Sequence, residues 1–89
     1  MMDLDVTVYS TTNCGYCELM KNFLHEQNIE FKVINIHRNP DMAQYLMQQT
    51  GRLGSPQTSI NGEWVLGYDP NTAMKIIEKS KRFSTMNGD

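Results

Sequence analysis

The sequence is short of the features that mark membrane proteins, nucleic-acid-binding proteins and disulfide-stapled folds. Its 89 residues include only two cysteines and one tryptophan. No apolar stretch approaches the ~18 residues that a membrane-spanning helix needs, and the N-terminus has no signal-like hydrophobic run. Lysine and arginine number 8 against 10 aspartates and glutamates, so the formal charge of −2 offers no basic surface for nucleic acid or anionic lipid. We therefore expect a cytoplasmic protein with no nucleic-acid or membrane partner.

The length allows one small domain and leaves no room for a second. With at most one disulfide, and that one local, the fold must rest on packing rather than on cross-links. We expect a domain over residues 1–83 and a polar, flexible C-terminal tail over residues 84–89. Few cysteines and no export signal favour a reducing compartment, where a close cysteine pair is more often catalytic or metal-binding than structural.

Both cysteines belong to the motif Cys14-Gly15-Tyr16-Cys17, placed where a strand-like run gives way to a helix-like one. Two thiols three positions apart at a helix start lie on one side of the first turn, close enough to bridge. A free thiol titrates near pH ~8.5, and the partial positive charge of a helix N-terminus lowers that value. The motif therefore predicts electron transfer between thiols and disulfides.

A structural zinc site is the alternative use of this cysteine pair. Tetrahedral zinc needs four ligands, and the histidines available are His25 and His37. His25 falls in the helix after the motif and His37 follows the second strand, so we do not expect them to converge on the sulfurs. We interpret both histidines as surface residues and assign no metal ligand.

The apolar pattern predicts the order β-α-β-α-β-β-α. The expected elements are a half-buried strand around Leu4 to Val8, a helix over 15–28, a strand over 31–36 covered on both faces, a helix from Asn39-Pro40 to Gly51, strands over 57–60 and 63–66 joined by Asn61-Gly62, and a helix opened by Asp69-Pro70. The methionines interpreted as core filler are Met20, Met42, Met47 and Met74. A strand-helix-strand start implies a parallel pair with a right-handed crossover, so we expect an α/β fold with a four-stranded mixed sheet and three flanking helices.

This order, with the cysteine motif at the first strand-to-helix junction and a proline before the hairpin, resembles the thioredoxin fold. Within that fold the chain is similar to the glutaredoxins from about residue 6 to residue 77. The motifs that carry the likeness are Val8-Tyr9-Ser10, Cys14-Gly15-Tyr16-Cys17, Gly51-Arg52, Ser55-Pro56-Gln57 and Gly67-Tyr68-Asp69. The resemblance implies a thiol–disulfide oxidoreductase that reduces protein disulfides or glutathione mixed disulfides.

The resemblance also implies roles for single residues. Cys14 would be the exposed attacking thiol and Cys17 the thiol that resolves the mixed disulfide. Pro56 matches the cis-proline of the family, which would turn the backbone of Ser55 toward a bound thiol compound. The residues expected at the substrate or glutathione site are Tyr16, Arg52, Ser55, Pro56, Tyr68 and Asp69.

Several of these residues have a second interpretation. Arg52 either takes a glycyl carboxylate as a fork donor or is a solvated loop cation. Asp69 either pairs with a γ-glutamyl ammonium, or caps the third helix, or does both. Tyr16 is expected to line the active-site edge and Tyr68 to contribute mainly backbone. Trp64, in the hairpin, is either an exposed contact for partners or a lid over the core.

Departures from the family pattern leave the reductant open. Gly15 stands where glutaredoxins usually carry proline, and Thr11 stands near a position where many carry lysine. The stretch over 61–70 also resembles NrdH-redoxins, which are reduced by thioredoxin reductase and supply electrons to ribonucleotide reductase. The resemblance thus implies glutathione, thioredoxin reductase or both as partners, together with disulfide-containing protein substrates.

The resemblance implies a monomer without a tightly bound cofactor, for which glutathione is the co-substrate. A glutathione-dependent [2Fe–2S] cluster carrier is the alternative. This chain has Gly15 in place of the usual active-site proline. Some glutaredoxins without that proline share such a cluster between two protomers, and thiolates are the usual ligands of the cluster.

Overall fold

The computed structural model describes residues 4–86, and the side chains of residues 4–80. Its elements are β1 (Val6–Ser10), α1 (Gly15–Glu26), β2 (Lys32–Asn35), α2 (Pro40–Thr50), β3 (Gln57–Ile60), β4 (Glu63–Leu66) and α3 (Pro70–Met86). This order confirms the predicted one. α3 continues past residue 84, where the tail was expected to begin, and residues 87–89 of that tail lie outside the described residues.

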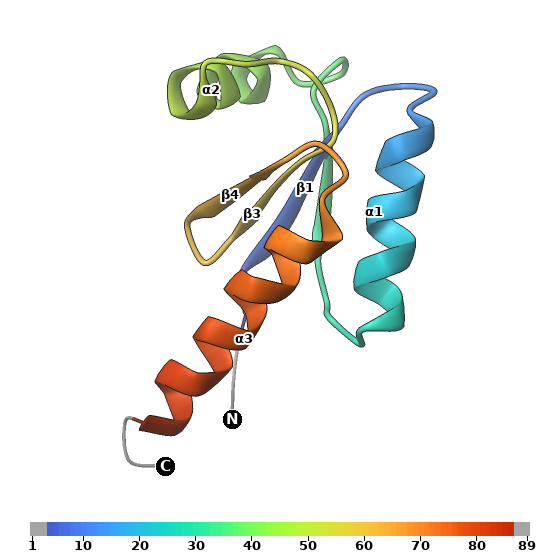
Figure 1. Cartoon of the computed structure of the whole chain (residues 1–89). Coiled ribbons are helices and arrows are strands. Elements are labelled where there is room, and N and C mark those ends of the chain that lie inside the picture. The colour runs from blue at the N-terminus through green and yellow to red at the C-terminus, as the bar shows by residue number, and fades with distance from the viewer. Residues whose placement is uncertain (1–3, 87–89) are drawn as a thin grey trace.

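The four strands form one mixed sheet in the order β2-β1-β3-β4. β1 runs parallel to β2 and antiparallel to β3, and the hairpin pairs β3 with β4. Figure 1 shows α1 and α3 beside the sheet and α2 across its upper end. This is the predicted α/β, thioredoxin-like arrangement, and it puts the start of α1 and the loop after α2 at the same end of the molecule.

Apolar side chains pack on both faces of the sheet. The larger cluster joins the sheet to α1 and α3 and contains Val6, Val8, Met20, Leu24, Ile29, Ile60, Val65, Ala73, Ile76 and Ile77. The smaller cluster joins the sheet to α2 through Tyr9, Ile36 and Leu46. Trp64 is half-buried against this second cluster, with its ring centroid 5.5 Å from that of Tyr9. Trp64 therefore acts as a lid over the core.

The burial of the first two strands is the reverse of the prediction. β1 is an interior strand, and Val8 and Tyr9 are both buried although they point to opposite faces. β2 is an edge strand with Val33 45% exposed, so the prediction of a strand covered on both faces is wrong. A β-branched run indicates a strand but does not say where in the sheet the strand lies, because the position depends on distant pairing partners.

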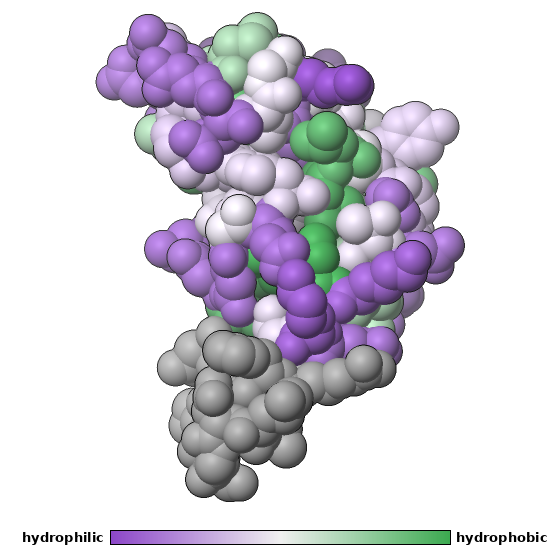
Figure 2. Space-filling view, turned by 60° about the vertical axis from the view of Figure 1, so that its left-hand side comes forward, coloured by the Kyte–Doolittle hydropathy of each residue, from purple (hydrophilic) through white to green (hydrophobic). Residues whose placement is uncertain are grey.

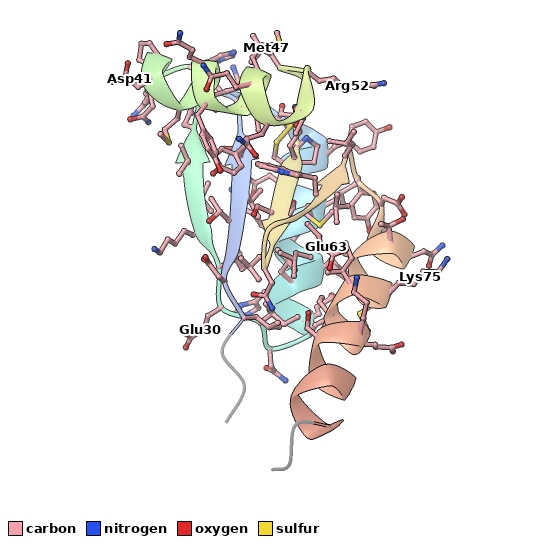
Figure 3. All side chains as sticks on the ribbon, turned by 90° about the vertical axis from the view of Figure 1, so that its left-hand side faces the viewer. Glu30, Asp41, Met47, Arg52, Glu63 and Lys75 are labelled. Atoms are coloured by element: carbon pink, nitrogen blue, oxygen red, sulfur yellow. A yellow bond between two sulfur atoms is a disulfide. The ribbon has the colours of Figure 1, made fainter. Side chains whose placement is uncertain are left out.

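The predicted ends of α2 are confirmed, whereas one methionine assigned to the core is exposed. α2 begins at Pro40 and ends before Gly51, whose φ of 74° is the left-handed conformation that favours glycine. Met47 is 44% exposed and points away from the sheet in Figure 3, so its assignment to the core is wrong. Met47 directly follows Leu46, which is fully buried. Because consecutive residues of a helix point about 100° apart, the side chain of Met47 is turned away from the core that Leu46 enters. Met20 is fully buried, as predicted.

The predicted hairpin has the bounds that the sequence indicated. Asn61 and Gly62 have positive φ values of 50° and 86°, as a two-residue hairpin turn requires. Among the helices of the described residues, none combines the length and apolar character that crossing a bilayer requires.

Candidate active site

The two cysteines lie at the start of α1 and form a disulfide. Cys14 is the N-cap residue, and its Sγ accepts a hydrogen bond from the backbone N–H of Cys17 at 3.1 Å. Cys17 is 1% exposed, whereas Cys14 is only partly buried. A partner molecule can therefore reach the first sulfur and not the second.

The loop before β3 brings a second group to the Cys14 sulfur. The Ser55–Pro56 peptide bond is cis, as the resemblance implied. The hydroxyl of Ser55 donates to Cys14 Sγ at 3.3 Å, and the hydroxyl of Thr11 lies 2.7 Å from Ser55 Oγ. Contacts from α1 and from the Ser55 loop thus converge on one sulfur, although Ser55 is 41 positions from Cys14 in the chain.

A groove of about 470 Å³ opens beside this loop. The residues that line it are Arg52, Gly54, Ser55, Pro56, Gln57, Leu66 and Gly67. It brings together three of the predicted site residues, and one of its walls is the serine that contacts the Cys14 sulfur.

Gln57 holds the wall of the groove in place, a role that the sequence did not reveal. Its side chain is 2% exposed, and Nε2 donates to the backbone carbonyls of Arg52 at 2.9 Å and Gly54 at 2.8 Å. Gln57 therefore binds two carbonyls of the loop that carries Arg52 and leads to Ser55. Thr50 Oγ1 adds contacts to the backbone N–H and carbonyl of Arg52, each at 3.2 Å. The available signal was a long amide side chain placed directly after the cis-proline, at the start of an interior strand.

The remaining predicted residues lie around the same end. Arg52 is exposed and extends outward from the loop after α2 (Figure 3), and among the described side chains none forms an ion pair with it. Tyr16 is 65% exposed and stacks with Tyr68 at a centroid distance of 6.5 Å. Tyr68, expected to contribute mainly backbone, thus places its ring beside Tyr16, the residue that precedes Cys17.

Asp69 caps α3, as one of its two interpretations predicted. Its carboxylate accepts hydrogen bonds from Thr72 Oγ1 at 2.7 Å and from the Thr72 backbone N–H at 3.2 Å. These bonds, first from the hydroxyl and then from the amide, hold the pKa of Asp69 below its ordinary value, and Lys75 adds to the effect. The carboxylate is therefore ionised at neutral pH.

The histidines are surface residues, as predicted. His25 and His37 are both exposed, and His37 Nδ1 accepts from the backbone N–H of Thr12 at 3.3 Å. Within residues 4–86, no three histidine, cysteine, aspartate or glutamate side chains gather as a metal site would require. On the face drawn in Figure 2, apolar side chains form only a narrow strip between hydrophilic ones.

Comparison with known proteins agrees with this geometry. The sequence model of the Glutaredoxin family matches residues 6–65. Mitochondrial glutaredoxin-2 of Bos taurus is 32% identical in an alignment of 69 positions that covers 70% of this chain and 41% of that protein. The chain thus spans about two fifths of that relative's length. Glutaredoxin-like protein NrdH of Lactococcus lactis subsp. cremoris is 31% identical over 71 residues, which are 80% of this chain and 97% of that one.

A solved structure from the same family is similar to the fold of this chain. The crystal structure of a buckwheat glutaredoxin–glutathione complex superposes with a TM-score of 0.69 at 25% identity and covers 96% of this chain and 80% of that one. The family match, the fold and the bridged cysteine pair at the start of α1 agree: this chain is a member of the glutaredoxin family and a thiol–disulfide oxidoreductase.

Proposed function

We propose that Cys14 is the attacking thiol and Cys17 the resolving thiol, and that the substrates are protein disulfides and glutathione mixed disulfides. The observation that carries the proposal is the position of the Cys14 sulfur, 3.1 Å from the Cys17 amide nitrogen at the start of α1. An amide donor and the helix dipole both favour the anionic form of a sulfur, and the thiolate is the attacking species. The burial of Cys17 leaves Cys14 as the sulfur that substrates meet.

The reaction proceeds in two exchanges. The Cys14 thiolate attacks one sulfur of the substrate disulfide, forms a mixed disulfide with it and displaces the other sulfur as a thiolate, which takes a proton from water. Cys17 then loses its proton and attacks the Cys14 sulfur, which closes the Cys14–Cys17 disulfide and releases the second substrate thiolate. The substrate gains two electrons and the protein loses two. Two glutathione molecules restore the dithiol and are oxidised to glutathione disulfide.

The groove beside Ser55 supports glutathione as the ligand. Its volume of about 470 Å³ falls in the range of small-molecule sites. The guanidinium of Arg52, at the edge of the groove, can donate two parallel hydrogen bonds to a carboxylate. The ionised carboxylate of Asp69 can bind an ammonium group. The similar buckwheat protein is a glutathione complex, which favours the same ligand here.

Cysteine variants test the assignment of the two thiols. NADPH oxidation is followed with glutathione and glutathione reductase, and the substrate is either a glutathionylated peptide or a protein disulfide. We expect Cys14→Ser to abolish both activities. Cys17→Ser should keep reduction of the glutathionylated peptide, which glutathione can complete, and lose reduction of the protein disulfide. Activity retained by Cys14→Ser would overturn the proposal.

A pair of arginine variants tests the ligand. Arg52→Ala should raise KM for the glutathionylated peptide by roughly tenfold, because a charged donor to a carboxylate is lost. Arg38→Ala is the matched control, since Arg38 is also an exposed cation and lies in the turn after β2. Equal KM values for the two variants would remove Arg52 from the binding site and leave it as a solvated cation.

An NrdH-like role is the second candidate, because the chain covers nearly the whole of a bacterial NrdH relative. The oxidised protein is mixed with NADPH and either glutathione plus glutathione reductase or thioredoxin reductase. Rapid reduction in the first mixture supports the glutathione-dependent function. Reduction in the second mixture alone would assign the chain to the NrdH type.

A glutathione-dependent [2Fe–2S] cluster carrier is the alternative function. Anaerobic reconstitution tests it, and a colourless product counts against it.

Two further expectations, a monomeric state and a cytoplasmic location, belong to the main proposal. A monomeric state is tested by light scattering on the reduced protein. A cytoplasmic location is tested by fractionation of cells that express the chain.

A further inference from the structure

The sulfur of Cys14 has two neighbours that the reaction described above does not use, the hydroxyls of Ser55 and Thr11. Ser55 Oγ lies 3.3 Å from Cys14 Sγ as a donor, and Thr11 Oγ1 lies 2.7 Å from Ser55 Oγ. Both side chains are partly buried, so water competes poorly for these bonds. The two contacts join β1's end, the Ser55 loop and the start of α1.

The direction of this chain of hydrogen bonds follows from counting hydrogens. A serine hydroxyl has one hydrogen, and Ser55 uses it toward the Cys14 sulfur. The short contact to Thr11 must then be a bond in which Thr11 donates and Ser55 accepts. A hydroxyl that accepts one bond becomes a stronger donor in the next, because the bonds polarise one another.

We propose that Thr11 and Ser55 form a hydroxyl relay that stabilises the Cys14 thiolate, with Ser55 as a catalytic residue in contact with the sulfur and Thr11 as its positioning residue. The relay acts mainly on the reduced protein. A sulfur in a disulfide is a weak, neutral acceptor, whereas a thiolate is an anion and accepts a much stronger hydrogen bond. Ser55 therefore favours the thiolate both over the thiol and over the disulfide.

The relay supplements the backbone amide of Cys17, which donates to the same sulfur from the first turn of α1. Together they provide one backbone and one side-chain donor. Thr11 and Cys14 also line a surface hollow of about 370 Å³, so a small electrophile can approach the sulfur without displacing Ser55. This accessibility makes the relay measurable by alkylation.

The test measures the rate of Cys14 alkylation by iodoacetamide against pH. Every variant is made in the Cys17→Ser background, where Cys14 is the only thiol of the chain. We expect Ser55→Ala to move the pH midpoint of alkylation upward by about one unit, the effect of losing one charge-assisted hydrogen bond. Thr11→Val should move it upward by about half a unit. Ser55→Thr and Thr11→Ser, which keep a hydroxyl, should restore most of each shift.

Thr12→Val is the matched control, because Thr12 is the next residue and its hydroxyl contacts Asn35 instead of Ser55. Its midpoint should equal that of the parent. A Ser55→Ala midpoint equal to the parent overturns the relay, and a Thr11→Val midpoint equal to that of Thr12→Val overturns the role of Thr11. Circular dichroism verifies that each variant is folded.

The relay rests on the proposed role of Cys14 as the attacking thiol, and the same experiment separates the two claims. If the parent itself has the alkaline midpoint of a model peptide thiol, the proposed function fails. If the parent midpoint is low and the hydroxyl variants do not move it, only the relay fails.

Discussion

Thr58 provides a test of the packing that supports the site. The residue lies on β3 between Val8 and Val65, its partners on the neighbouring strands, and all three are almost fully buried. Its Oγ1 has no hydrogen-bond partner in the part of the chain that the structure describes. A hydroxyl buried without a partner costs about 1–3 kcal/mol of folding free energy. Replacing it with a methyl group of similar size should remove that cost.

Thr58→Val should therefore raise the free energy of unfolding by about 1–2 kcal/mol. For a domain of this size each kcal/mol corresponds to about 4–8 °C in Tm. The assay is urea unfolding of the oxidised protein, followed by the fluorescence of Trp64, the chain's one tryptophan, which packs on Tyr9.

Thr7→Val is the matched control for this change. Thr7 is also a strand threonine, but it is only partly buried, and its side chain lies on the other face of the sheet. Its unfolding free energy should stay within about 0.5 kcal/mol of the parent. If Thr58→Val is no more stable than the parent while the control is unchanged, the hydroxyl has a partner in solution and the reasoning fails.

Three other variants probe the groove and α3. Gln57→Ala should lose two hydrogen bonds to the Arg52 loop and speed tryptic cleavage after Arg52 by roughly tenfold; unchanged cleavage would mean that other contacts, such as those of Thr50, hold the loop. The pKa of Asp69 is lowered by folding, so its contribution is present above pH 4 and lost as pH falls through the folded pKa. Asp69→Asn should keep the cap and lose this part of the pH dependence in urea unfolding, whereas Asp69→Ala should be less stable at neutral pH; equal behaviour of the two would contradict the cap. Lys79→Met removes a surface ion pair with Glu63 and should change the unfolding free energy by less than about 1 kcal/mol, so a larger loss would mark that pair as structural.

The elements that sequence predicted well are those defined by local backbone chemistry. Asn61-Gly62 gave the hairpin its bounds because both residues accept the positive φ that the turn requires. Gly51 ended α2 for the same reason, and Asp69 capped α3 through a residue three positions away. Each of these features is determined within about four residues of chain.

What sequence did not predict depends on contacts between distant segments. The exposure of Val33 follows from β2 being an edge strand, which its own residues do not encode. Likewise, Ser55 meets Thr11 across 44 positions and Cys14 across 41, and no spacing rule links them. The cysteine motif could be found from sequence, and the resemblance implied that Ser55 lies at the site. The contacts of the Ser55 and Thr11 hydroxyls around the sulfur could not be predicted.

Competitive labelling of the freshly reduced chain measures directly which of the two sulfurs is the nucleophile. Less than one equivalent of iodoacetamide is added at pH 6, and peptide mass spectrometry locates the label. The helix-start geometry predicts label on Cys14 alone, at a rate roughly tenfold or more above that of a model peptide thiol. Label shared equally with Cys17, or a rate no faster than that of the peptide, would contradict it.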